Sequence, residues 1–262
     1  MNRILNILYT ILLILVLIMI ILYQYPKKND SFSYSKPLIS IFILNYERPH
    51  NLETLLSTIS HYSDPIGEII VCNTHPMHAI HKISYGEKLG NIPIYIYHDF
   101  EYKNRYGAAR RWKNALKWCH YPWILFLDDD IVPSFSLINK MYTEAQEDIM
   151  TIYGPILRRC DISGYYTNAT PENYNVILTP ILLVNQSLLI EYMKDGWNQH
   201  ESFLEKTKGN GEDLSINSFL YHRQKKPIYV EGSYEWLDTR KGYSSRPYHF
   251  QQRRQFCQDL FF

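Results

Sequence analysis

The stretch Trp123–Asp130 reads WILFLDDD and decides the fold. Its apolar residues, 123–127, follow one another without alternation, which is typical of a strand buried on both faces of an α/β sheet. The run ends abruptly at three adjacent carboxylates, Asp128, Asp129 and Asp130. Open α/β sheets bind ligands beyond the carboxyl ends of their strands, so we expect these aspartates to belong to a binding site.

Three adjacent carboxylates repel one another strongly in a low-dielectric site unless a cation compensates their charge. The simplest compensation is a hard divalent cation, Mn²⁺ or Mg²⁺, held by one or two carboxylates and completed by substrate phosphates. The alternative is a solvated turn, in which Asp130 or Ser134 caps a helix that begins near Pro133. The aspartates alone leave both interpretations open.

The composition narrows the class of protein. A chain of 262 residues holds one large domain or two small ones. The net charge of +1 provides no basic surface for a nucleic acid, so we expect no nucleic-acid partner. The four cysteines are far apart and form no CxxC pair, which argues against a zinc site, and their spacing does not reveal a disulfide.

The N-terminal residues predict a membrane anchor. Ile4–Tyr23 is almost wholly apolar, and a helix of that length rises about 30 Å, the thickness of a hydrocarbon core. A cleaved signal peptide would have a shorter apolar region ending in small residues, whereas this one ends in Tyr23–Pro26. We therefore expect a transmembrane signal anchor over residues 1–25, a short stem over 26–37 and one domain over 38–262.

Charges and glycosylation motifs do not decide the orientation of this anchor. Arg3 precedes the span and Lys27 and Lys28 follow it, so the positive-inside rule nearly cancels. Sequons for N-linked glycans occur at Asn29, Asn168 and Asn185, no more than chance would supply.

Strands and helices alternate over the first half of the chain, which predicts a parallel, doubly wound sheet. The expected strands are residues 38–44, 68–72, 92–97 and 123–127, and the expected helices are 51–62 and 106–120. Right-handed crossovers would gather the ends of these strands at one edge of the sheet. The segments brought together there are Tyr46–Arg48, Asn73, Asn104–Arg105 and Asp128–Asp130.

The side chains at this edge suit a nucleotide. Guanidinium groups match the oxygens of a diphosphate with paired hydrogen bonds. The arginines available are Arg48, Arg105 and Arg110. Asn45 and Asn73 can pair with the edge of a base, and Tyr46 can stack on its face. Each residue alone is common in loops, so the prediction of a nucleotide site rests on their occurrence together at the ends of successive strands.

The second half of the chain predicts a less regular arrangement. The expected elements are a helix over 134–148, a strand over 151–156, a hairpin or loop over 157–175, a strand over 175–180 and a helix over 186–193. Residues 209–213, GNGED, then open a helix over 214–222. Glu212 and Asp213 either partner the positive end of that helix or face a bound acceptor. The basic, aromatic tail, 242–262, is either a surface helix or a cap that supplies another arginine to the phosphates.

With these residues in place, the chain resembles the GT-A glycosyltransferases, and most closely the exostosin-like family of retaining N-acetylhexosaminyltransferases that act in heparan sulfate synthesis. The similar segments occur in the same order over most of residues 38–260. They are Ile43–Arg48, Asp128–Asp130, Asn210–Asp213 with Asn217, and Gly242–Ser244 followed by Arg246, His249, Phe250, Arg253 and Cys257.

The chain departs from that family at three places. Gly211 stands where the family has a cysteine, so a disulfide from there to the tail cannot form, and Cys257 needs another partner or none. The loop between Tyr243 and Arg246 is shorter than the family's. Glu212 stands where the family has an aspartate, and its longer side chain alters the fit of donor or acceptor.

The resemblance implies an α/β fold of GT-A type, with a doubly wound mixed sheet in a single nucleotide-sugar-binding domain behind one N-terminal transmembrane helix. It implies transfer of an N-acetylhexosamine from a UDP-sugar to a hydroxyl of a glycan or glycoprotein acceptor, with Mn²⁺ or Mg²⁺ as cofactor. It also implies a single-pass type II membrane protein with the domain in the lumen of the endoplasmic reticulum or Golgi.

The resemblance also assigns roles to residues. Asp130 and Asp128 would hold the metal ion. The donor-binding residues would be Asn45, Tyr46, Arg48, Asn73, Asn104, Arg105, Arg110, Asp128 and Asp129. The catalytic residues would be Asp213, Glu212 and Arg246. In a retaining enzyme Asp213 would orient donor and acceptor, whereas in an inverting, family-2-like GT-A transferase it would be the general base, and the sequence does not separate these chemistries.

Two alternatives belong to other classes of protein. Haloacid-type phosphatases also carry an Asp-x-Asp after an apolar strand, but near the start of their domain, whereas three strands precede it here. A non-catalytic, membrane-anchored carbohydrate-binding protein would need neither metal nor nucleotide. Thermal stabilisation by UDP only in the presence of Mn²⁺ would separate these possibilities.

Overall fold

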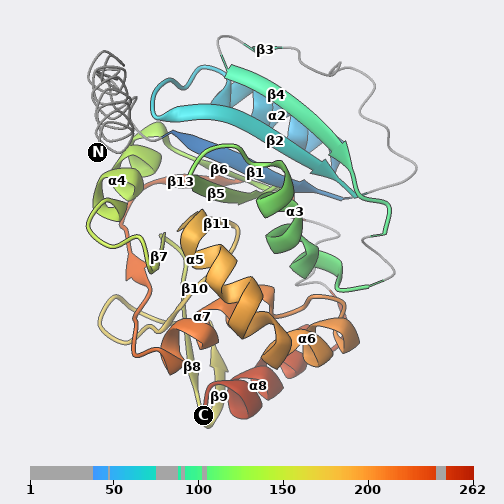
Figure 1. The fold of residues 1–262 in the computed structure, drawn as a ribbon, viewed down its shortest axis with the longest axis vertical. Coiled ribbons are helices and arrows are strands. Elements are labelled where there is room, and N and C mark those ends of the chain that lie inside the picture. Colours follow the sequence, from blue (N-terminus) through green and yellow to red (C-terminus); the bar gives the residue numbers. More distant parts are fainter. Residues whose placement is uncertain (1–37, 47, 75–87, 90–91, 102–104, 240–245) are drawn as a thin grey trace, which may run out of the picture. The chain divides into compact units, whose positions relative to one another are not determined.

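A mixed sheet of eight strands, in the order β12-β7-β11-β5-β1-β2-β4-β3, forms the centre of the molecule (Figure 1). The computed structural model describes residues 38–46, 48–74, 88–89, 92–101, 105–239 and 246–262. The predicted anchor, the predicted stem and Asn104 lie outside these residues. Within the described ranges no helix is long and apolar enough to cross a membrane.

Four parallel strands form one half of the sheet: β1 (Ile39–Asn45), β2 (Ile66–Asn73), β4 (Ile92–His98) and β5 (Trp123–Asp128). β1 lies between β2 and β5 and runs parallel to both, as the sequence predicts. The chain extends the sheet from β1 through β2 to β4 on one side and then returns to place β5 on the other side. This reversal creates a crevice at the carboxyl ends of β1 and β5, the usual place for a ligand in such sheets.

The other half of the sheet is mostly antiparallel. The strands added there are β11 (Ile181–Asn185), β7 (Ile152–Gly154) and β12 (Ile228–Tyr229). β11 pairs antiparallel with both β5 and β7, and β12 runs parallel to β7. At the opposite edge, β3 (Lys88–Leu89) pairs antiparallel with β4. The predicted mixed sheet is therefore confirmed.

The strand expected over residues 175–180 is wrong in its bounds. Val176–Ile177 forms β10, which pairs with β8 in a separate small sheet, and the central strand β11 begins only at Ile181. Pro180 separates the two strands, because proline cannot donate a hydrogen bond to a ladder. The run 176–185 thus supplies β10 to the small sheet and β11 to the central sheet.

Helices cover both faces of the sheet. They are α2 (Pro49–Ile59), α3 (Arg110–Trp118), α4 (Phe135–Ala145), α5 (Gln186–Glu191) and α7 (Glu212–His222). α2 and α4 share a core with Ile41 and Ile43 of β1, whereas α3 and α5 share one with Phe42 and Leu44. Successive side chains of a strand point to opposite faces, which explains this division.

Two helical predictions need correction at their ends. Ser134 caps α4, because its Oγ accepts a hydrogen bond from Leu137 N at 3.2 Å, so the helix itself starts one residue later. The helix expected over 186–193 is longer: α5 continues through a π-helical segment, η2 (Tyr192–Gly196), into α6 (Trp197–Lys206).

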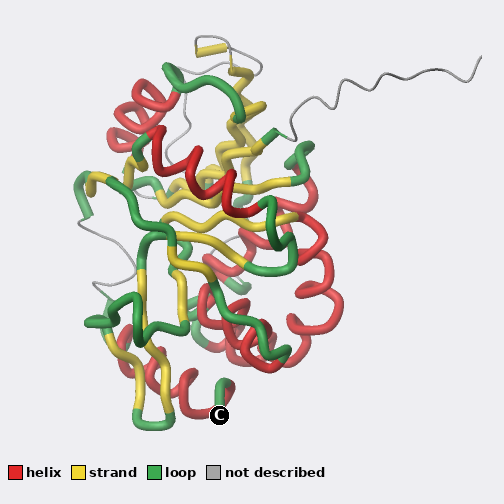
Figure 2. Tube along the Cα trace, turned by 90° about the vertical axis from the view of Figure 1, so that its left-hand side faces the viewer, coloured by secondary structure: helices red, strands yellow, loops and turns green. Residues whose placement is uncertain are grey.

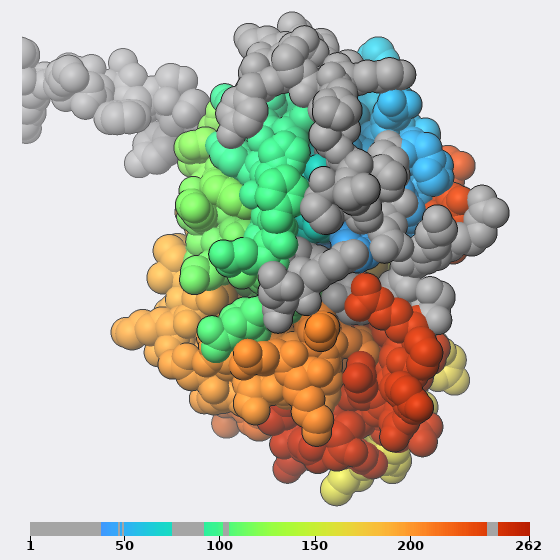
Figure 3. Space-filling view, turned by 90° about the vertical axis from the view of Figure 1, so that its right-hand side faces the viewer, coloured from blue at the N-terminus to red at the C-terminus, as the bar shows by residue number. Residues whose placement is uncertain are grey.

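Smaller elements surround the crevice. The short strands are β6 (Ile131–Pro133), β8 (Leu157–Asp161), β9 (Gly164–Tyr166) and β13 (Tyr234–Trp236), and the remaining helices are η1 (Gly107–Ala109) and α8 (His249–Leu260). β6 pairs with β13, and β8 pairs with β9 in a hairpin that projects at the lower end of Figure 2. α8 packs against this hairpin and against α7. Figure 3 shows the C-terminal segment, in red, beside the orange helices.

Candidate active site

A cavity of about 260 Å³ opens at the carboxyl ends of β1 and β5, where Leu44 is in register with Asp128. Its lining combines these strand ends with residues of α3, the β8–β9 hairpin, the start of α7, β13 and the C-terminal tail. Eight of the predicted site residues line it: Tyr46, Arg48, Asp128, Asp129, Asp130, Glu212, Asp213 and Arg246. Segments from the whole length of the domain thus converge on the crevice.

Arg48 is the counter-ion of the aspartate motif. Its guanidinium lies 2.5 Å from Asp129 Oδ1 and also pairs with Asp130 Oδ2, while Tyr46 N donates to Asp129 Oδ2 at 3.1 Å. Burial nevertheless raises the pKa of Asp129 to about 6. Burial, reinforced by the charge of Asp128, raises the pKa of Asp130 to about 7. Arg48 therefore does not fully compensate the charges of Asp129 and Asp130, and a further cation would favour the ionised form of both carboxyls.

The residues fit a divalent cation that is shared with a phosphorylated substrate. Asp130 Oδ1 is buried in the cavity wall and has no hydrogen-bond partner. Among the described residues no three His, Cys, Asp or Glu side chains form a ready-made metal cage. Mg²⁺ and similar ions do not need one, because one or two carboxylates, water and substrate phosphates complete their coordination. Asp130 and Asp128, the predicted ligands of the ion, both line the cavity.

Two neighbouring arginines of α3 point in different directions. Arg111 is buried and its Nη2 lies 2.9 Å from Asp128 Oδ1 and 3.6 Å from Glu212 Oε1, so it links the aspartate motif to α7. Arg110 instead pairs with Asp99 through two hydrogen bonds of 2.6 and 2.9 Å. Arg111 lines the cavity and Arg110 does not. Arg110, which the sequence predicts to bind the donor, therefore lies outside the cavity lining, and its neighbour Arg111 lies within it.

The acidic pair lies at the start of α7. Asp213 Oδ2 accepts a hydrogen bond from Arg253 Nη2 at 2.7 Å, and its Oδ1 accepts one from Leu214 N at 2.8 Å. Glu212 Oε1 accepts one from Thr179 Oγ1 at 3.0 Å. Burial, reinforced by the neighbouring charge of Asp213, raises the pKa of Glu212 to about 7. The carboxylates sit at the helix N-terminus and also line the cavity, a position that agrees with both alternatives for the pair.

Glycine 209 brings α7 close to η1 and α3. Gly209 adopts a φ of +82°, and a Cβ placed there would lie 2.3 Å from Tyr106 O and 2.6 Å from the backbone nitrogens of Ala108 and Ala109. No side chain can occupy that space without moving the backbone. The segment that carries Arg111 and the segment that carries the acidic pair are therefore in direct backbone contact.

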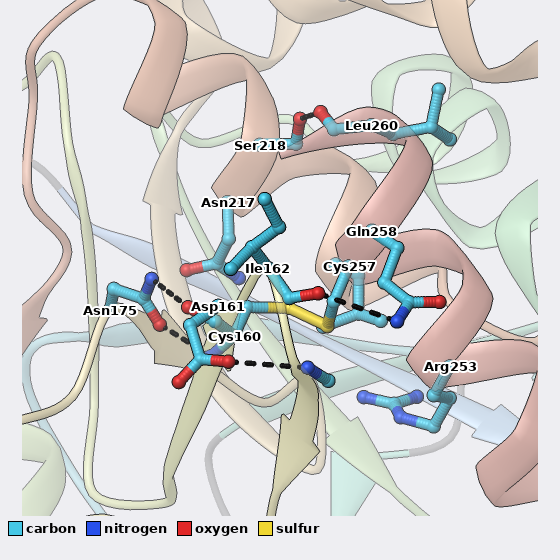
Figure 4. Close-up of a disulfide and its surroundings, with 12 residues drawn as sticks. Cys160, Asp161, Ile162, Asn175, Asn217, Ser218, Arg253, Cys257, Gln258 and Leu260 are labelled. Carbon is cyan, nitrogen blue, oxygen red and sulfur yellow. Dashed lines mark hydrogen bonds between the residues drawn. A yellow bond between two sulfur atoms is a disulfide. The ribbon is translucent and has the colours of Figure 1, made fainter. Parts of the chain in front are cut away.

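A disulfide holds the C-terminal helix beside the cavity (Figure 4). Cys160 of β8 is bonded to Cys257 of α8, with their Cα atoms 5.4 Å apart, which identifies the partner that the sequence left open. α8 also carries Arg253, and the residues Arg246, His249 and Phe250 at its start line the same cavity. Burial lowers the pKa of His249 to about 4, so this imidazole is neutral near pH 7. The tail is thus a helix that closes the fold, and it also brings Arg246 and Arg253 to the cavity lining.

Several predicted donor-binding residues lie outside the cavity lining. Asn45 and Asn73 are fully buried and bonded to each other, with Asn45 Nδ2 donating to Asn73 Oδ1 at 3.1 Å. Arg105 is exposed and pairs with Glu205 at 3.0 Å. The geometry therefore gives these side chains contacts within the protein in place of the predicted contacts with a nucleotide. Asn104 lies outside the described residues.

Sequence reasoning also missed residues of the second half. The additional polar residues that line the cavity include Arg158, Thr179 and Asn210. Asn210 Nδ2 donates to His249 O at 3.0 Å and to Gln252 Oε1 at 2.7 Å, which fixes the amide. Only the GNGED motif signalled Asn210 in advance. Arg158 and Thr179 lie in segments that gave no chemical signal.

Comparisons with known proteins agree with this architecture. The chain matches the glycosyl transferase family 64 domain over residues 39–261. No curated protein sequence matches it significantly. Its fold is similar to a crystal structure of GalNAc-T7 with UDP, GalNAc and Mn²⁺, with a TM-score of 0.61 and 11% identity over 80% of this chain and 45% of that one.

A second similar structure is the mannosyltransferase PcManGT from Pyrobaculum calidifontis in complex with GDP-Man and Mn²⁺, with a TM-score of 0.51 and 14% identity over 79% of this chain and 59% of that one. The chain thus spans about half the length of these two proteins. Identities this low establish the fold alone. The family match covers most of the chain, and the chain therefore belongs to glycosyl transferase family 64, a glycosyltransferase with the mixed sheet of the GT-A fold.

Proposed function

We propose that the protein transfers a sugar, an N-acetylhexosamine as in the exostosin-like enzymes, from a UDP-sugar to a hydroxyl of a glycan or glycoprotein acceptor, with Mn²⁺ or Mg²⁺ as cofactor and with retention of configuration. The observation that carries this proposal is that two separate groups of carboxylates line the same cavity. The under-compensated aspartates lie at the end of β5, and the acidic pair lies at the start of α7.

The aspartate side of the cavity suits the diphosphate of the donor. Asp130 and Asp128 would hold the cation, which when bound would neutralise the phosphates and stabilise the departing UDP. Arg111 keeps Asp128 in place through its 2.9 Å contact. Arg48 keeps Asp129 and Asp130 ordered. The similar structures contain UDP or GDP-mannose together with Mn²⁺, which supports a nucleotide-sugar donor for this fold.

The acidic side of the cavity suits the reacting sugars. Asp213 is ion-paired with Arg253, and this contact fixes the carboxylate where it can orient hydroxyl groups. In a retaining reaction Asp213 positions donor and acceptor, and the acceptor proton passes to the leaving phosphate. In an inverting reaction Asp213 would itself take that proton as general base.

The test is thermal stabilisation by UDP with and without Mn²⁺. We expect UDP to raise the melting temperature only with Mn²⁺, and Asp130→Ala to abolish this effect while keeping the fold. Asp259→Ala is the matched control, because Asp259 is exposed on α8 outside the cavity. If UDP stabilises the Asp130→Ala variant as it does the parent, the metal assignment is wrong. A carbohydrate-binding protein without enzymatic activity would show no response to UDP in any variant.

We also propose a type II orientation, with residues 1–25 as the anchor and the domain in the lumen of the secretory pathway. The disulfide between Cys160 and Cys257 supports it, because disulfides persist in oxidising compartments. In sealed microsomes, protease should then spare the domain unless detergent is added. A glycan is expected at exposed Asn168 but not at Asn185, which is buried and caps α5 by accepting from Ser187 N. Digestion without detergent would place the domain in the cytosol.

A further inference from the structure

Strand pairing holds the backbone of Trp236 beside the aspartate motif. It lies on β13, in register with Ile131 of β6, the residue that follows Asp130. The next residue, Leu237, donates its backbone N–H to Asp130 O at 2.8 Å. Asn51 Nδ2 then donates to Asp238 O at 2.8 Å. These hydrogen bonds therefore hold the backbone of Trp236 beside the carboxylates.

The indole lines the cavity and is nevertheless 46% exposed. Phe250, which is 55% exposed, and the partly buried Tyr165 line the same cavity, with their ring centroids 6.5 Å apart. The charged residues Asp129, Asp130, Glu212 and Asp213 are all buried. The cavity thus has a buried, charged floor and an exposed, aromatic rim.

The rim residues are not equally available to a ligand. Arg253 Cζ lies 4.6 Å from the centroid of Tyr165, so the guanidinium already covers one face of that ring. In the described part of the chain, Trp236 contacts the ring of Tyr234, with the two ring centroids 6.2 Å apart. The contact is edge-on, so Tyr234 does not cover a face of the indole. Trp236 and Phe250 therefore both present exposed aromatic surface at the cavity mouth, and Trp236 is the one whose backbone is hydrogen-bonded beside Asp130.

The exposed aromatic rim suits the sugar ring of an acceptor in a glycosyl transfer. A pyranose ring has an apolar face of C–H groups and a polar periphery of hydroxyls, and aromatic faces with nearby polar groups bind such amphipathic molecules. The diphosphate of the donor must reach the buried aspartates of the floor. The acceptor must approach Asp213 from solvent, and it passes the rim when it does so.

We propose that Trp236 is the platform on which a sugar ring of the acceptor stacks, so that the acceptor is a saccharide rather than a bare peptide hydroxyl. This inference rests on the proposed function, because it assumes that a nucleotide-sugar occupies the floor of the cavity. Trp236 binds the acceptor and determines its class, and it takes no part in the proton transfer.

The intrinsic fluorescence of the full-length protein gives the test. The chain has five tryptophans, of which Trp112, Trp123 and Trp197 are buried and Trp118 is partly buried outside the cavity. The probes are methyl glycosides of glucose, galactose, mannose, N-acetylglucosamine and glucuronic acid, added to the protein with UDP and Mn²⁺. N-acetylserinamide, which carries a peptide-like hydroxyl, is the probe for the competing class of acceptor.

We expect a saturable change of tryptophan emission with at least one glycoside and none with N-acetylserinamide. The change should disappear in Trp236→Phe and persist in the matched variant Trp118→Phe. By saturation-transfer NMR, Trp236→Ala should weaken binding of that glycoside about tenfold or more, and Trp236→Phe should weaken it less, because phenylalanine keeps part of the stacking surface.

The outcomes separate this inference from the proposed function. If the parent protein is not stabilised by UDP and Mn²⁺, the proposed function fails. If UDP and Mn²⁺ bind but no glycoside alters the emission, or Trp236→Ala binds the glycoside as the parent does, the platform does not exist. If UDP with Mn²⁺ alone produces the Trp236-dependent change, the indole contacts the nucleotide, and the acceptor assignment is overturned.

Discussion

Arg253 and Asp213, 40 residues apart, form a buried ion pair of 2.7 Å that joins the C-terminal helix to the acidic start of α7. Burial of this guanidinium opposes its charge, yet the carboxylate of Asp213 raises the pKa of Arg253 well above its ordinary value. The cation is therefore permanent, and the carboxylate of Asp213 has a fixed partner.

Removal of that partner should destabilise the protein. Arg253→Ala leaves a buried carboxylate without its cation, which typically costs about 3–5 kcal/mol. Urea unfolding measures the loss, and sugar transfer should fall with it. Arg254→Ala is the control, because Arg254 is the exposed neighbour on the same helix and should change stability by less than about 0.5 kcal/mol. Equal effects of the two substitutions would contradict the assigned ion pair.

Asp213→Asn tests the chemistry directly. If Asp213 is a general base, the transfer rate should fall roughly 10²–10⁴-fold while the donor still binds. If the enzyme is retaining, the amide keeps part of the orienting role, and slow hydrolysis of the UDP-sugar by water should fall as well, because the donor is mispositioned. NMR of the first-formed product decides independently of the variant. A β-linkage formed from an α-linked UDP-sugar would exclude retention.

The two arginines of α3 should behave oppositely. Arg111→Ala removes the link between Asp128 and Glu212, so we expect loss of UDP binding in the presence of Mn²⁺. Arg110→Ala removes the pair with Asp99 and should lower the urea midpoint while leaving UDP affinity close to that of the parent. Isothermal titration and urea unfolding on both variants check this. Weaker UDP binding by Arg110→Ala than by Arg111→Ala would reverse the assignment.

The disulfide should contribute to stability. Its cysteines are 97 residues apart, and closing a loop of that size stabilises a protein by about 4.7 kcal/mol in the chain-entropy model, within a measured range of about 2–5 kcal/mol for native disulfides. The double variant Cys160→Ser/Cys257→Ser should therefore unfold at lower urea. Dithiothreitol should lower the midpoint of the parent but not that of the variant. An equal effect of reductant on both proteins would show that dithiothreitol does not act through this disulfide.

Stability should depend on pH through Glu212. Its pKa is about 7 when folded against an ordinary value of 4.5, so the folded state binds the proton more tightly. Its contribution to stability is full below pH 4.5 and is lost as the pH rises through 7. Glu212→Gln cannot ionise, so its stability relative to the parent should increase between pH 5 and pH 8 in the presence of EDTA. A constant difference between the two proteins would show that Glu212 does not titrate in this window.

The strand ends were the predictable part of the site. Unbroken apolar runs identified β1, β2 and β5, and the rules for parallel crossovers then placed Arg48 near the aspartates, as the structure shows. These inferences succeed because burial and chain handedness constrain a parallel sheet strongly. The acidic start of α7 was also predictable, since the glycines that flank Asn210 mark a helix entry.

The direction of individual side chains was not predictable to the same extent. Successive residues of a helix are rotated by about 100°, so the choice between Arg110 and Arg111 depends on the exact phase of α3, which its composition does not reveal. Asn45 and Asn73 are equally polar whether they meet a base or each other, and only the register of β1 against β2 places them side by side. The antiparallel strand β11 was missed because one apolar run crosses from one sheet to another at Pro180.

The backbone contact at Gly209 constrains the distance between two parts of the site, whereas the rim of the cavity is under no such constraint. The spacing between the arginine-bearing helix and the acid-bearing helix depends on the absence of a Cβ at Gly209 and on the core that α3 and α7 share. A side chain at position 209 would force the two segments apart, whereas the exposed rim residues Trp236 and Phe250 lie outside that shared core. New acceptor preferences are accordingly accessible through the rim while the reacting groups keep their separation.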